Sequence, residues 1–71
     1  MEKLDLTGVA CPQNSGRALL KLAQMDKGDI LEIVLDDGEP VENVLRSIED
    51  DGYSVVSRKR KDKQWVLSVR I

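Results

Sequence analysis

Hydrophobic and polar residues alternate in four short stretches of the chain, and this pattern predicts four β-strands. In the second stretch apolar residues fall on both faces, which favours a central strand over an edge strand. Only a short turn separates the last two stretches, so they are predicted to form an antiparallel hairpin. The four predicted strands cover residues 3–7, 30–35, 53–61 and 64–71.

Two further stretches repeat their apolar residues with the period of an α-helix. The first predicted helix runs from Pro12 to about Asp26, and the second opens in the acidic segment 36–40 and ends near Gly52. Proline is favoured in the first turn of a helix, and acidic residues are favoured near its positive N-terminal end. Both residue types therefore support a helix start in segment 36–40. The predicted buried stripes are Ser15, Ala18, Leu19, Leu22 and Met25 in the first helix, and Val41, Val44, Leu45 and Ile48 in the second.

The predicted order of elements is β-α-β-α-β-β, which indicates an α+β fold. A strand, a helix and a second strand favour a parallel pair with a right-handed crossover. Two helices with one apolar stripe each can cover one face of a mixed four-stranded sheet, giving a two-layer α/β sandwich. The loops 8–11 and 36–39 follow the two parallel strands, so both loops and both helix N-termini are expected at the same sheet edge.

Length and composition exclude several classes of protein and of functional site. A chain of 71 residues is too short for two hydrophobic cores, so a single domain over residues 1–71 is expected. One cysteine and no histidine exclude an internal disulfide, a zinc cage and histidine-assisted nucleophilic catalysis within the chain. We therefore expect no metal. The longest apolar runs are triplets and the start is acidic, so we expect a cytoplasmic protein without a membrane partner. We also expect a monomer.

Charge is distributed unevenly along the chain. Residues 29–51 hold nine acidic residues against one basic residue, whereas residues 52–71 hold six basic residues against one acidic residue. The basic run 58–63 opens an alternative function, an RNA-binding or non-catalytic regulatory adaptor module that uses this hairpin. However, the two aromatic residues, Tyr53 and Trp65, form no stacking platform, so direct nucleic-acid binding is disfavoured.

The segment from Gly8 to Pro12 carries the strongest candidate for chemistry. Pro12 is the expected first residue of the helix, which makes Cys11 its N-cap. A thiolate in this place would be stabilised by the backbone N–H of Gln13 or Asn14 and by the positive end of the helix. The alternative is that Cys11 is a small buried hydrophobic residue, although it lies outside both apolar stripes.

Charged neighbours modify this candidate site. The carboxylates of Asp36 and Asp37 in the adjacent loop oppose a thiolate, so the sulfur is predicted to be accessible but only modestly activated. Together with Glu39, these residues are expected to cap the second helix rather than to bind a cation. Arg17 and Lys21 could contact an acidic partner, or could be ordinary solvated charges. Asp36 and Asp37 are also possible partner contacts.

Several segments resemble the TusA/SirA-like sulfur carriers. The family's first strand has the pattern Leu-Asp-Leu-x-Gly, matched here by Leu4-Asp5-Leu6-Thr7-Gly8. Its Cys-Pro-x-Pro motif is matched by Cys11-Pro12-Gln13-Asn14, with asparagine in place of the second proline. The segments 27–33, Asp36-Asp37 and Gly52-Tyr53 also fit the family, so the resemblance covers essentially the whole chain.

The resemblance implies a specific function. Proteins of this family accept sulfur as a persulfide on the motif cysteine, here Cys11, with Asp5, Gly8, Pro12, Gln13 and Asn14 as the surrounding motif. They receive it from a sulfur donor, such as a cysteine desulfurase or another sulfurtransferase, and pass it to a downstream acceptor. The routes served include tRNA thiolation, cofactor assembly and sulfur metabolism. Such a domain binds no cofactor and is a carrier as much as a catalyst.

Overall fold

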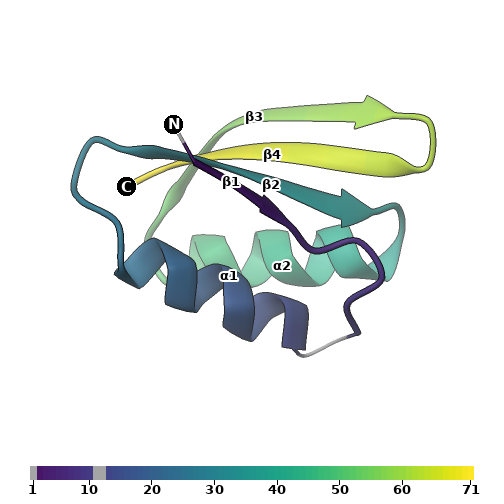
Figure 1. Cartoon of the computed structure of the whole chain (residues 1–71), viewed down its shortest axis with the longest axis horizontal. Helices are drawn as coiled ribbons and strands as arrows, with labels where there is room; N and C mark the ends of the chain where they lie inside the picture. Colours follow the sequence, from purple (N-terminus) through teal and green to yellow (C-terminus); the bar gives the residue numbers. More distant parts are fainter. Residues whose placement is uncertain (1, 11–12) are drawn as a thin grey trace.

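The computed structural model describes residues 2–10 and 13–71, and within them strands and helices follow the predicted order (Figure 1). Each element starts and ends within a few residues of its predicted bounds. In chain order the elements are β1 (Glu2–Asp5), α1 (Gln13–Ala23), β2 (Ile30–Asp36), α2 (Glu39–Asp50), β3 (Ser54–Lys61) and β4 (Gln64–Arg70).

The strands form a mixed sheet in the order β1-β2-β4-β3. β1 is parallel to β2, and β4 is antiparallel both to β2 and to its hairpin partner β3. The prediction of β2 as a central strand is confirmed, as is the final hairpin. Both helices lie on the same face of the sheet (Figure 1), so the predicted α+β sandwich of two layers is also confirmed.

The core lies between the sheet and the two helices. Alternate residues of β2 and β4 point to the helix-covered face, as the period of a strand requires, and they meet the apolar stripes of α1 and α2. The buried cluster comprises Leu6, Ala18, Leu22, Leu31, Ile33, Leu35, Val41, Val44, Ile48, Leu67 and Val69.

The buried face of α1 differs from the predicted stripe at one position. Asn14 is fully buried, with 0% of its surface exposed, whereas Ser15 is only partly buried. The buried residues of this helix, Asn14, Ala18 and Leu22, follow a four-residue spacing, which defines a row down one side of a helix. This row places the polar Asn14, rather than Ser15, against the core.

The start of β1 and the C-terminus lie at the end of the sheet opposite the loop between β1 and α1 (Figure 1). There the N–H of Ile71 donates to the carbonyl oxygen of Asp29 at 3.0 Å, and the N–H of Gly28 donates to that of Ile71 at 2.8 Å. The helices of residues 13–23 and 39–50 are both too short to span a membrane.

Candidate functional site

The loop after β1 leads the chain towards the predicted sulfur site. The Leu6 N–H continues the pairing with β2 by donating to the Val34 carbonyl oxygen at 2.8 Å. The chain then turns at Gly8, whose φ of 77° lies in the left-handed region that favours glycine. The Val9 N–H closes the turn by donating to the Leu6 carbonyl oxygen at 3.2 Å. The glycine of the motif therefore provides the sharp turn that redirects the backbone out of the sheet.

Asp5 stabilises the same turn through its side chain. Its Oδ1 atom accepts hydrogen bonds from the Thr7 hydroxyl at 2.6 Å and from the Thr7 N–H at 2.9 Å. The hydroxyl bond, followed by the backbone bond, lowers the pKa of Asp5 from its ordinary value of 3.8. Asp5 thus acts as a local turn-forming residue, a common role of aspartate two residues before the group it binds.

Asp36, at the end of β2, connects the two loops at this edge of the sheet. Its Oδ2 atom accepts a hydrogen bond of 2.7 Å from the Gly8 N–H. The predicted proximity of the loops that follow β1 and β2 is therefore confirmed. The Asp36 carboxylate is part of the support of the loop, a role that sequence reasoning had not assigned to it.

The start of α1 is organised by Asn14. Its N–H donates to the Ala10 carbonyl oxygen at 3.1 Å, and its side-chain Oδ1 accepts from the Ser15 N–H at 2.7 Å. The Asn14 N–H therefore already has an acceptor within the chain, and support of a sulfur by this group stays a prediction. Gln13, the first residue of α1, is exposed.

Cys11 and Pro12 lie outside the residues that the structure describes. The predictions of an N-cap position for Cys11, an accessible sulfur and a helix start at Pro12 therefore stay predictions. On the two sides of this pair, Ala10 and Gln13 are both exposed, while Val9 packs against the core. The described part of the loop thus reaches the surface on both sides of the motif cysteine.

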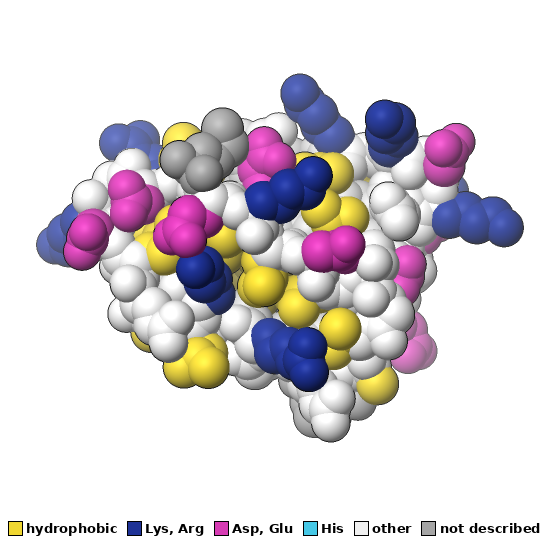
Figure 2. Space-filling model, in the orientation of Figure 1, with side chains coloured by type: hydrophobic (Ala, Val, Ile, Leu, Met, Phe, Trp, Pro, Cys, Tyr) yellow, Lys and Arg dark blue, Asp and Glu magenta, His cyan; other side chains and the backbone are white. Residues whose placement is uncertain are grey.

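Arg17 and Lys21 occupy different environments on α1. Lys21 forms an ion pair with Glu2 of β1, with 2.8 Å between Nζ and Oε1, and so links the helix to the edge strand. Arg17 is exposed and takes part in no ion pair among residues 2–10 and 13–71. Figure 2 shows basic and acidic side chains interspersed over one face of the molecule, with apolar surface between them.

The acidic loop before α2 does not cap that helix with its side chains, so this prediction is wrong. The N-cap is Gly38, without a side-chain hydrogen bond, and Pro40 lies in the first turn as predicted. The Asp37 carboxylate instead accepts a hydrogen bond of 2.7 Å from the Trp65 indole N–H and forms an ion pair of 3.0 Å with Arg60. The competing partners on β3 and β4, far away in sequence, explain why local capping rules failed here.

The partners of Asp37 shift its acidity. The indole hydrogen bond is the largest cause and lowers the pKa of Asp37 from its ordinary value of 3.8. Burial, the next in size, opposes this shift, and the positive charge of Arg60 lowers the pKa further. The Asp37 N–H also donates to the Lys63 carbonyl oxygen at 2.9 Å. The described residues contain no cluster of three side chains suited to hold a metal ion.

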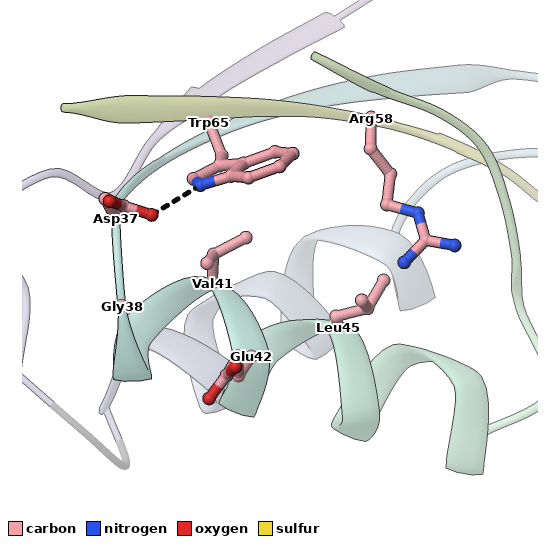
Figure 3. Close-up of a pocket in the computed structure, with 7 residues that line it drawn as sticks. All are labelled: Asp37, Gly38, Val41, Glu42, Leu45, Arg58 and Trp65. Atoms are coloured by element: carbon pink, nitrogen blue, oxygen red, sulfur yellow. Dashed lines mark hydrogen bonds between the residues drawn. The ribbon is translucent and has the colours of Figure 1, made fainter. Parts of the chain in front are cut away.

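A pocket opens next to this group, between α2 and the β3–β4 hairpin (Figure 3). It has a volume of about 260 Å³. Sequence reasoning assigned Trp65 only to the apolar alternation of the last strand and missed the pocket. The available signal was an aromatic residue just after the basic run 58–63. The lining residues are Asp37, Gly38, Val41, Glu42, Leu45, Arg58 and Trp65.

Comparisons with known proteins agree with the fold and the motif. The family model described as "Sulfurtransferase TusA" matches residues 2–71. A protein of Archaeoglobus fulgidus named "Putative sulfur carrier protein" is 36% identical over 70 residues, which cover 97% of this chain and 80% of that protein. A similarly named protein of Methanocaldococcus jannaschii is 31% identical over 70 residues, covering 99% and 93%.

A solved structure supports the same fold. The SirA-like protein of Desulfitobacterium hafniense superposes with a TM-score of 0.85, and the match covers 99% of this chain and 96% of that one. At 24% sequence identity this likeness concerns the fold alone. The fold and the resemblance predicted from the sequence are therefore both confirmed.

Proposed function

Because the chain belongs to the TusA family of sulfurtransferases, we propose that it is a sulfur carrier that holds persulfide sulfur on Cys11. The observation that carries the proposal is the family match over residues 2–71, which includes the only cysteine of the chain. The Gly8–Asp36 hydrogen bond supports it, since this bond anchors the loop that leads to the cysteine.

The chemistry is a transfer between two sulfur atoms. The Cys11 thiolate attacks the terminal sulfur of a persulfide on the donor protein, and a new bond forms between Sγ and that sulfur. The sulfur–sulfur bond of the donor breaks, and the donor cysteine leaves as a thiolate. The acceptor then attacks the persulfide of Cys11 in the same way. No net electrons are exchanged in either step, so the transfer needs no redox cofactor.

The partners follow from this chemistry. The donor is a protein that carries a persulfide, such as a cysteine desulfurase or another sulfurtransferase. The acceptor belongs to a route that uses transferred sulfur, such as tRNA thiolation, cofactor assembly or sulfur metabolism. Arg17, exposed on α1, is the described cation of this helix that is free to contact an acidic partner surface.

Mass spectrometry tests the proposal directly. Incubation with a cysteine desulfurase and free cysteine should add one sulfur atom, about 32 Da, and a thiol reductant should remove it. The Cys11→Ser variant should gain no mass, whereas Ser57→Ala, a hydroxyl change in β3, should behave like the unchanged protein. Mass gain in Cys11→Ser, or no gain in the unchanged protein with several persulfide donors, would contradict the proposal.

A further inference from the structure

The pocket between α2 and the hairpin has an apolar floor with charges at its two ends. Val41 and Leu45 of α2 face the Trp65 ring across the pocket (Figure 3). All three side chains belong to the buried cluster or pack against it, so the floor is continuous with the core. Such a surface can take an apolar side chain out of water without rearranging the protein.

The Trp65 ring is fixed in place before any ligand arrives. Its indole N–H donates to Asp37 at 2.7 Å, and Arg60 neutralises the same carboxylate at 3.0 Å. A side chain that is already held in its binding orientation loses little entropy when a ligand binds. The pocket is therefore preorganised on its aromatic side.

Arg58 provides a cation at the other end of the pocket. It pairs across the strands with Leu67, whose side chain is buried beneath the helices, so Arg58 emerges on the same face. Figure 3 shows its guanidinium group directed towards Leu45. Within residues 2–10 and 13–71 Arg58 has no ion pair or hydrogen-bond partner. This exposed guanidinium is available to a carboxylate.

The second acidic residue of the pocket lining, Glu42, also lies on α2. Leu45 separates it from Arg58 along the helix, and the Glu42 carboxylate points away from the Trp65 ring (Figure 3). The pocket is thus positive at the Arg58 end and negative at the Glu42 end. A nucleic-acid strand would bring phosphates to both ends and would be repelled at one of them. A peptide segment can place a single carboxylate at the positive end alone.

From this geometry we propose that the pocket binds a protein segment in which a large apolar side chain lies next to an acidic residue. The apolar side chain packs between Trp65, Val41 and Leu45, and the carboxylate pairs with Arg58. The volume of about 260 Å³ lies below the range of about 300–1,000 Å³ typical of small-molecule sites, which favours one inserted side chain. This docking site is independent of Cys11 and of sulfur transfer.

The single tryptophan of the chain makes the proposal measurable, because all indole emission comes from Trp65. The probes are blocked hexapeptides, Gly-Ser-Leu-Glu-Ser-Gly and Gly-Ser-Glu-Leu-Ser-Gly, titrated into the full chain. At least one should change the emission saturably and shift backbone amide signals of α2 and β4. Replacing the glutamate of the bound peptide by glutamine should weaken binding about threefold, the effect of an exposed ion pair.

Two variants separate specific pairing from general charge attraction. Arg58→Gln should weaken the binding of the acidic peptide about threefold, so that the acidic peptide and the glutamine peptide bind this variant with equal affinity. Lys59→Gln removes the same charge from the next residue, which pairs with Val66 on the other face, and should leave the affinity unchanged. Far-ultraviolet circular dichroism confirms that both variants are folded.

Four results would overturn the proposal. The first is the absence of a saturable response to either acidic peptide, and the second is equal weakening by Arg58→Gln and Lys59→Gln. The third is a response of Trp65 to an oligouridylate but not to the peptides, which would indicate a nucleic-acid site. The fourth is a change of Trp65 emission with protein concentration alone, which would show that a second copy of the chain fills the pocket.

Discussion

The backbone N–H of Gly8 donates to the carboxylate of Asp36 over 2.7 Å, although the two residues are 28 positions apart in the sequence. This bond joins the turn after β1 to the end of β2. Gly8 has a left-handed φ of 77°, so its N–H direction depends on a conformation that other residues rarely adopt. The pair therefore fixes both the path and the anchoring of the chain just before the motif cysteine.

Replacing Asp36 by alanine should weaken this anchor. Loss of a hydrogen bond to a charged acceptor at the surface should lower the free energy of unfolding by about 1 kcal/mol. The rate of persulfide formation on Cys11 should fall as well, because the preceding loop loses its attachment to β2. Urea unfolding and time-resolved mass spectrometry measure the two effects. Asp50→Ala, an exposed acid at the end of α2, should change neither quantity.

Replacing Asn14 by proline, the residue of the family motif, should destabilise this chain. The variant loses the N–H that donates to Ala10 and the side-chain oxygen that accepts from Ser15. We expect a loss of about 1–3 kcal/mol in the free energy of unfolding, since a buried polar arrangement is removed. Gln13→Ala, at the exposed neighbouring position, should cost less than about 0.5 kcal/mol. Equal stability of Asn14→Pro and the unchanged protein would contradict this role of Asn14.

Acid should break the contact between Asp37 and Trp65. The pKa of Asp37 is lower in the folded protein than its ordinary value of 3.8, so the carboxylate contributes stability above that pH. The contribution is lost as the pH falls through the lower folded value. Trp65 emission should accordingly change with a midpoint below 3.8. The uncharged Asp37→Asn variant should lack this transition while circular dichroism still reports a folded chain.

Two leucines of α1 provide a matched test of the core. Leu22 is buried, whereas Leu20 is 62% exposed on the other side of the helix. Leu22→Ala should lower the free energy of unfolding by about 2–5 kcal/mol, because it leaves a cavity between α1 and the sheet. Leu20→Ala should change it by less than about 0.5 kcal/mol. Similar losses in both variants would show that α1 does not pack on the sheet as described.

The sequence predicted the order of elements and the central place of β2 because these depend on local periodicity. Apolar residues on both faces of 30–35 favour a central strand, and the structure places this strand between β1 and β4. The proximity of the loops at Gly8 and Asp36 also followed from a parallel crossover alone. Such features need no knowledge of particular side-chain contacts.

Contacts between distant side chains were not predictable in the same way. Asp37 matches the composition of a helix cap, but its oxygen atoms bind Trp65 and Arg60 of the hairpin instead. Asn14 is polar, and it is buried because of the way α1 is rotated about its axis on the sheet. The apolar pattern predicts that rotation only to within about one residue. The pocket, which needs both α2 and the hairpin, was therefore missed.

Within residues 2–10 and 13–71, β1 is the shortest strand, has β2 as its sole neighbour in the sheet and, apart from Leu4, is exposed throughout. An edge strand of this kind is expected to fray at a far smaller free-energy cost than global unfolding. Its opening would leave the β2–β4–β3 part of the sheet intact, and the Leu6–Val34 and Gly8–Asp36 hydrogen bonds, which lie beyond β1, would still hold the turn to β2. The position of the segment before the motif cysteine thus does not depend on the edge strand, and the first residues of the chain can separate from the sheet without displacing it.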